Sequence, residues 1–138
     1  MALPVLLVAG AVMLVAAGPA TSEPQVIRTY NARDIVITLL GPNATWTAGD
    51  NPVILEFDSA TRKRLIDVGT PTLMASLPVP GGRPMLAVAR LSRGDATGRY
   101  VGVITLPRPG DWSVTVRWSG PAQPASATFI VPARSARP

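Results

Sequence analysis

Two methionines, Met74 and Met85, carry the softest potential metal donors in the part of the chain that follows its apolar N-terminus. A thioether sulfur suits Cu(I), and the Pro/Gly-rich stretch 78–84 could fold the two side chains together. Copper sites of this kind usually add histidine or cysteine, and the chain contains neither. Both methionines alternate with apolar neighbours, so we expect them to pack in the core or at an interface, with copper binding as the alternative.

The absence of histidine and cysteine excludes several kinds of catalytic and metal site. Disulfides, thiolate nucleophiles, Cys/His zinc sites and histidine-based acid–base catalysis all require residues that this chain lacks. Lys63 is the only candidate base for activating a serine or threonine. No glycine-rich loop precedes a predicted helix, so the sequence shows no phosphate-binding loop. The carboxylates show no spacing typical of a catalytic pair: Asp50, Glu56, Asp58, Asp67, Asp95 and Asp111. We therefore expect a protein that is not an enzyme.

The basic residues are mostly scattered arginines, which give the chain a net charge of +5. A nucleic-acid-binding protein usually concentrates its charge and adds stacking aromatic side chains, so nucleic acid is not an expected partner. The one cluster is Arg62, Lys63 and Arg64 in a polar segment. We expect a solvated loop there, and its functional interpretation is contact with lipid headgroups or with an acidic subunit.

The clearest structural pattern lies in residues 94–118. Strands are predicted at about 99–106 and 111–119, and Pro107, Pro109 and Gly110 between them predict a reversal into a β-hairpin. Alternate residues of the second strand are apolar and would face a core: Trp112, Val114, Val116 and Trp118. The two tryptophans would supply much of that core.

Further short extended segments recur about every ten residues, separated by turns rich in the chain's 15 prolines and 12 glycines. They lie at 26–30, 34–40, 53–58, 65–68, 72–77, 85–91 and 125–131. This pattern predicts an all-β fold, an immunoglobulin-like antiparallel β-sandwich of seven to nine strands over residues 34–132. Residues 21–33 are assigned to a linker and first strand, and 133–138 to a flexible basic tail. Tyr100 resembles a tyrosine corner, whose hydroxyl bonds back to the preceding turn.

Residues 2–20 contain no charged side chain and would reach roughly 28 Å as a helix, about the thickness of a bilayer core. A secretory signal would explain the small residues near position 20, but it normally begins with lysine or arginine. We expect residues 1–20 to form a retained transmembrane helix that anchors the chain in the lipid bilayer. A cleaved signal segment is the alternative.

Several motifs together resemble the FixH/YtkA-like domains of bacteria. These are the spaced methionines Met74 and Met85, the Gly-Arg-Tyr that ends at Tyr100, and Pro-Gly-Asp-Trp-Ser-Val-Thr-Val at 109–116. The similarity covers roughly residues 34–132 and is strongest at 98–116. It implies a membrane-anchored or exported immunoglobulin-like domain whose relatives are associated with cytochrome oxidase assembly or extracytoplasmic copper handling. It also favours a periplasmic domain, although Arg28 and Arg33 alone would favour the cytoplasm.

Two functions remain from this reasoning. The main prediction is a non-catalytic accessory or scaffolding subunit of a bacterial membrane complex, with a respiratory or photosynthetic electron-transfer assembly as host by analogy. Such a subunit would be a single-pass protein of the inner membrane, would contact other subunits through its periplasmic domain and would need no cofactor. The alternative is a copper-handling or cytochrome-oxidase assembly factor of the FixH/YtkA-like type, with Met74 and Met85 as Cu(I) ligands.

Overall fold

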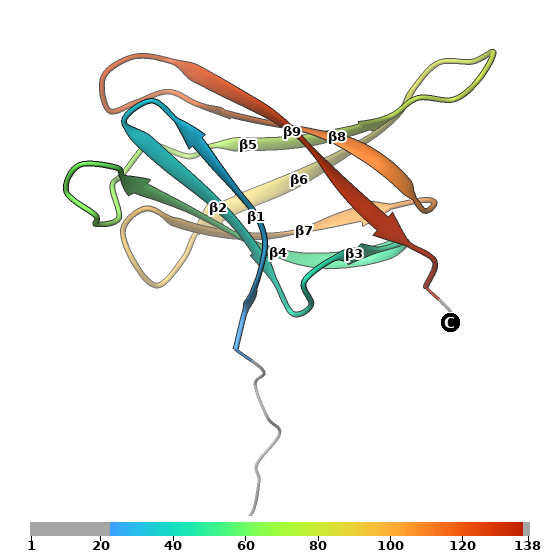
Figure 1. Ribbon diagram of the computed structural model, residues 1–138, viewed down its shortest axis with the longest axis horizontal. Helices are drawn as coiled ribbons and strands as arrows, with labels where there is room; N and C mark the ends of the chain where they lie inside the picture. Colours follow the sequence, from blue (N-terminus) through green and yellow to red (C-terminus); the bar gives the residue numbers. More distant parts are fainter. Residues whose placement is uncertain (1–22, 137–138) are drawn as a thin grey trace, which may run out of the picture.

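The computed structural model describes residues 23–136, and all of the regular secondary structure in this range is β-strand (Figure 1). The nine strands are β1 (Gln25–Ala32), β2 (Ile35–Gly41), β3 (Trp46–Thr47), β4 (Gly49–Ser59), β5 (Thr72–Leu77), β6 (Met85–Arg93), β7 (Arg99–Leu106), β8 (Gly110–Trp118) and β9 (Ala125–Arg134). The predicted all-β class is confirmed. The anchor or signal helix expected at 1–20 lies outside the described residues, and within them no helix is long and apolar enough to cross a bilayer.

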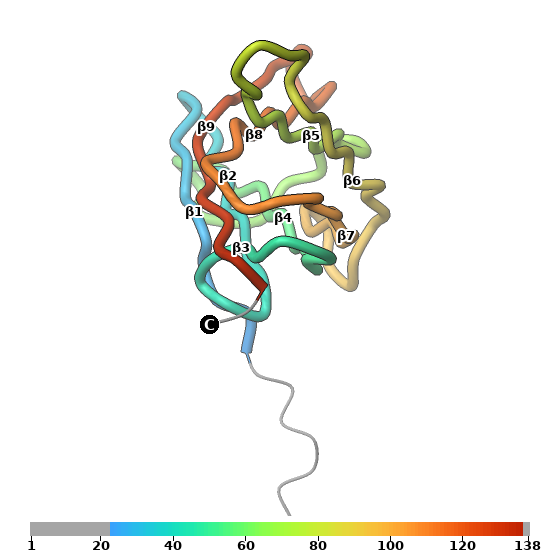
Figure 2. Tube along the Cα trace, turned by 90° about the vertical axis from the view of Figure 1, so that its right-hand side faces the viewer, coloured from blue at the N-terminus to red at the C-terminus, as the bar shows by residue number. Residues whose placement is uncertain are grey.

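The strands form one continuous hydrogen-bonded order, β1-β2-β4-β7-β6-β5-β8-β9-β3. Strand β6 joins the two halves, because its residues 85–89 pair with β5 and its residues 90–93 pair with β7. Seen from the side in Figure 2, the strands surround a single interior. All pairs are antiparallel except the short β3–β9 pair. The sandwich is therefore continuous along one side and resembles a nearly closed barrel.

The opposite side is closed by side chains between β1 and β9. The Tyr30 and Phe129 rings stack with their centroids 5.8 Å apart. The Arg28 guanidinium donates hydrogen bonds to the Ile130 carbonyl from Nε, at 3.1 Å, and from Nη2. These contacts cover strand edges that would otherwise present unpaired backbone groups to other chains.

The strands β7 and β8 do not form the hairpin that their sequence predicted. Strand β7 pairs with β4 and β6, whereas β8 pairs with β5 and β9. The segment Pro107–Pro109 therefore carries the chain from one layer to the other. Proline and glycine mark a change of direction, but they do not determine which strand becomes the hydrogen-bonded neighbour.

The interior is filled by alternate side chains of these strands. In β8, Trp112, Val114 and Val116 are fully buried and Trp118 is 5% exposed. The Phe57 ring packs edge-on against Tyr100 at 5.8 Å and against Trp118 at 5.5 Å. Each large apolar side chain buried in this way stabilises the fold by about 1.5–3 kcal/mol.

Two segments differ from the sequence-based strand assignment. Residues 65–68 were predicted as a strand, but only one isolated bridge forms there, between Leu65 and Asp58. Val68 is nevertheless fully buried, so its apolar character reflects a loop that covers the core. At the other end of the chain, β9 continues to Arg134, beyond the boundary expected at 132, and Ala133 is buried.

The junction between β6 and β7 requires a glycine at position 102. A Cβ atom on Gly102 would lie 2.3 Å from the Arg90 carbonyl oxygen, which is backbone and cannot move aside cheaply. We expect Gly102→Ala to lower the free energy of unfolding by about 1–3 kcal/mol, as overpacking in a core does. Gly82→Ala is the control, because its Cβ would meet only Val79 at 3.6 Å. Equal thermal denaturation midpoints for the two variants would contradict this assignment.

Candidate functional site

The two methionines proposed as Cu(I) ligands lie on opposite faces of the sheet. Directly opposite residues of an antiparallel pair point to the same face, and Met85 is opposite the buried Leu77. Met85 accordingly packs against the core. Met74 is opposite the exposed Val88 and is itself 37% exposed. The structure does not bring the two thioethers together.

No other set of metal donors takes their place in the described range. Within residues 23–136, no group of three or more carboxylates is close enough to hold a metal ion. Glu56 and Asp58 lie two residues apart in β4, but Glu56 is bound to Arg99, with Oε2 3.1 Å from Nη2. Burial, followed by the nearby Glu56 charge, raises the pKa of Asp58. These residues do not fit a resident copper ion, whose usual protein ligands are imidazole, thiolate and thioether.

Tyr100 anchors the loop that follows β4. Its hydroxyl accepts a hydrogen bond from the buried Val68 N–H at 3.2 Å and lies 3.2 Å from Asp67 Oδ1, to which it donates. The geometry is related to a tyrosine corner, but the partner is the β4–β5 loop and not the turn before β7. Desolvation is the main reason why the pKa of Tyr100 is raised. Tyr100 therefore has a structural role at the loop end of the domain.

Two ion-pair groups surround this tyrosine. Arg93 Nη1 lies 2.9 Å from Asp67 Oδ2, and this hydrogen bond is the largest reason why the pKa of Asp67 is lowered. Arg99 bridges Glu56 and Asp95, and its hydrogen bond to Asp95 lowers the pKa of that carboxyl. The Asp67 and Asp95 pairs are solvent-exposed, so they orient the loops more than they stabilise the fold.

The basic cluster Arg62, Lys63 and Arg64 occupies the turn that follows β4, and all three residues are exposed. The turn is closed by backbone hydrogen bonds of 2.8 Å from Lys63 N to the Ser59 carbonyl and from Ser59 N to the Arg64 carbonyl. Lys63 adopts a left-handed conformation with a φ of 51°. The turn presents positive charge to solvent, and Arg62 also lines an open pocket at this end of the domain.

The outer face of β5 and β6 carries an exposed apolar patch that the sequence analysis missed. Leu86 is 62% exposed and Val88 is 63% exposed, and Met74 lies directly opposite Val88. We call Met74, Leu86 and Val88 the β5–β6 patch. A signal was present in the sequence, because residues 85–89 are apolar at every position and not only at alternate ones. Such a run indicates a strand whose second face also meets an apolar surface.

The sheet around this patch carries little charge. The neighbouring outward-facing residues on β8 and β9 include Thr115 and Thr128, whose hydroxyls are 3.2 Å apart, and the exposed Ile130. Alternation places Arg90 and Arg117 at one end of this face and Asp111 at the other. The centre of the face is therefore uncharged over four strands.

Comparison with known proteins identifies similar folds but no similar sequence. No protein-family model matches the chain, and no curated protein is significantly similar to it in sequence. The fold is similar to two copper-bound bacterial proteins. A copper-bound variant of FetP from uropathogenic Escherichia coli matches with a TM-score of 0.52 and 7% identity, over 80% of this chain and 97% of that protein. A copper-bound variant of Campylobacter jejuni P19 matches with a TM-score of 0.50 and 10% identity, over 80% of this chain and 96% of P19.

These similarities establish a shared fold. The matches span nearly the full length of FetP and P19, so the likeness concerns the whole domain and not a single sheet. At identities of 7% and 10%, they do not transfer a ligand set from one protein to another. The FixH/YtkA-like resemblance therefore stays an interpretation of the sequence.

Removing the Tyr100 hydroxyl tests its structural role. In Tyr100→Phe the ring still fills the core, but the buried Val68 N–H loses its only hydrogen-bond partner among the described residues. We expect the free energy of unfolding to fall by about 1–3 kcal/mol, the usual cost of an unpaired buried donor. Tyr30→Phe is the matched control, because the Tyr30 hydroxyl makes no hydrogen bond within residues 23–136. Chemical denaturation that shows no difference between the two variants would argue against the anchoring role.

Proposed function

We propose that this chain is a non-catalytic accessory protein of extracytoplasmic copper handling or cytochrome-oxidase assembly. The observation that carries the proposal is the likeness of the whole domain to two copper-bound proteins, FetP and P19. The FixH/YtkA-like resemblance of residues 34–132 points to the same process. In this proposal the domain is an immunoglobulin-like sandwich, stands outside the cytoplasm and is tethered by residues 2–20.

The donor chemistry shapes how such a protein would act. Met85 packs against the core and Met74 is a single exposed thioether, which is too few ligands for a closed copper site. The chain has no histidine or cysteine, and within residues 23–136 Met74 and Met85 are the only methionines. We therefore propose that the chain acts by contact with a partner protein and does not store copper itself.

Deletion of the gene in the source organism tests this function. We expect membranes from the deletion strain, grown at limiting copper, to contain less copper per haem in their terminal oxidase, and the wild-type gene to restore it. The purified full-length chain, titrated with Cu(I) against a chelator, should bind no tighter than about micromolar, because Met74 supplies one ligand. Met74→Leu should weaken that binding, and the matched variant Met85→Leu should leave it unchanged. An unchanged oxidase copper content would overturn the proposal, and nanomolar Cu(I) binding would overturn the partner-based mechanism.

A second candidate function is that of a scaffolding subunit in a membrane complex. The β5–β6 patch favours it, since Leu86 and Val88 are the two most exposed large apolar side chains in the described range. The uncharged centre of this face is complementary to a protein surface that is apolar at its own centre. An assembly factor could use the same contact. The two candidate functions differ in the lifetime of the complex, which is permanent for a scaffolding subunit and transient for an assembly factor.

Co-purification under gentle solubilisation tests the patch. We expect the wild-type chain to migrate with a stoichiometric protein partner, and Leu86→Ser/Val88→Ser to lose that partner, because the apolar contact area is removed. Val26→Ser/Val103→Ser is the matched control, since both residues are exposed apolar positions on other strands. Migration of the wild-type chain as a lone monomer would reject the scaffolding role.

A further inference from the structure

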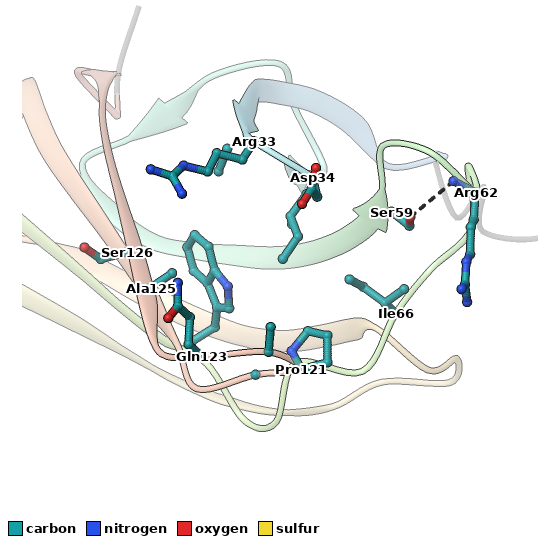
Figure 3. A pocket seen from close by; sticks show the side chains of 14 residues that line it. Arg33, Asp34, Ser59, Arg62, Ile66, Pro121, Gln123, Ala125 and Ser126 are labelled. Carbon is teal, nitrogen blue, oxygen red and sulfur yellow. Dashed lines mark hydrogen bonds between the residues drawn. The ribbon is translucent and has the colours of Figure 1, made fainter.

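A pocket opens at the end of the domain that carries the β1–β2 turn. It is lined by that turn, by the turn after β4 and by the segment between β8 and β9, and its volume is about 550 Å³. Figure 3 shows Arg33 and Asp34 along one side, with Pro121 and Gln123 opposite them. This volume lies within the range of about 300–1,000 Å³ that is typical of small-molecule sites.

Trp118 lines this pocket with its indole ring. The residue lines the pocket and is only 5% exposed, yet its indole Nε1–H has no hydrogen-bond partner among the described residues. In Trp112, by contrast, the indole N–H donates to the Arg108 carbonyl at 3.1 Å. The Trp118 ring is held in place by Phe57, with centroids 5.5 Å apart. Within residues 23–136 the fully buried indole N–H that lacks an acceptor is that of Trp46, whereas the Trp118 N–H is reached by solvent and is available to a ligand that enters the pocket.

Two arginines give the rim of the pocket a positive charge. Arg33 lies in the two-residue turn between β1 and β2 with a φ of 52°, and Arg62 lies across from it in the turn after β4 (Figure 3). Neither guanidinium is in an ion pair within residues 23–136, where the paired arginines are Arg93 and Arg99. Asp34 is the only carboxylate among the lining residues. Cationic donors therefore outnumber anions around the opening.

The wall between these donors is apolar. Ile35, Ile66 and Pro121 line it together with the indole of Trp118. An apolar wall favours a ligand with a flat or branched hydrocarbon body, and a guanidinium at the rim favours an anionic acceptor at one end of that ligand. The combination selects for a molecule that has both parts.

We propose that this pocket binds a small carboxylate with a flat apolar body. The carboxylate accepts hydrogen bonds from Arg33 or Arg62, and the body packs against Trp118 and Ile66. Neither the copper-handling proposal nor the β5–β6 patch assigns any role to this pocket, and the binding requires no metal. Ligand binding in this pocket is therefore independent of the proposed function in copper handling.

The three indole N–H signals of the full-length, 15N-labelled chain provide the test. We expect 3-phenylpropionate to shift the Trp118 indole signal, while the Trp46 and Trp112 signals remain in place because both residues are buried away from the pocket. The alcohol 3-phenylpropanol has the same body without the charge. It should bind about tenfold more weakly, since a charge-assisted hydrogen bond contributes at least about 1.4 kcal/mol.

Variants of the rim separate specific recognition from overall charge. Arg33→Gln/Arg62→Gln should weaken 3-phenylpropionate binding about tenfold and leave 3-phenylpropanol binding unchanged. Arg83→Gln/Arg108→Gln changes the net charge equally in loops at the other end of the domain and should have no effect. Asp34→Asn should tighten binding, because it removes the only carboxylate at the pocket. Well-dispersed amide spectra would show that each variant is folded.

Three results would overturn the proposal. One is the absence of a Trp118 shift at any soluble concentration of 3-phenylpropionate. Another is equal affinity for the acid and the alcohol, which would show an apolar cleft without anion recognition. The third is equal weakening by the two double-arginine variants, which would show a dependence on overall charge alone.

Discussion

The backbone hydrogen bonding of β6 to both of its neighbours is the constraint on which the rest of this structure depends. Because residues 85–89 pair with β5 and residues 90–93 pair with β7, the two layers share one strand and cannot separate. The close approach of β7 requires Gly102, whose hydrogen faces the Arg90 carbonyl. On the opposite side, Arg28 and the Tyr30–Phe129 stack close the structure with side chains. The domain therefore presents faces and loop ends to its surroundings, and almost no free strand edge.

Because the strand edges are mostly covered, the candidate binding surfaces lie on the outer face of the sheet and at its loop ends. The β5–β6 patch lies on the outer face of the layer that β6 joins, so it is held on a rigid surface of four paired strands. The pocket lies instead at a loop end, where Tyr100 and Asp67 hold the β4–β5 loop and Phe57 holds Trp118. A flat apolar face suits a protein partner, and a concave site with an apolar wall and a basic rim suits a small ligand. The two features can serve different partners without competing.

The similarity to FetP and P19 separates fold from chemistry. The domain has the same architecture as these copper-bound proteins, yet it has no histidine or cysteine and no cluster of acidic ligands within residues 23–136. A β-sandwich is stabilised by its interior, and its surface donors can be lost without loss of the fold. Placing this chain in copper handling therefore requires a role through a partner, and that role is consistent with an exposed apolar face.

The sequence by itself determined most of the extended segments and the inward-facing side chains of β8. In β8, the flanking proline and glycine predicted where the strand begins. The alternation of apolar residues predicted that Trp112 and Trp118 face the core, because a period of two places alternate side chains on one face. Only the tertiary structure decided which strands are neighbours, since alternation carries no information about the partner strand. It separated β7 from β8, turned Met74 and Met85 to opposite faces, and kept segment 65–68 as a loop. It also brought Arg33, Arg62 and Trp118 around one pocket, because their proximity depends on pairings between segments far apart in the chain.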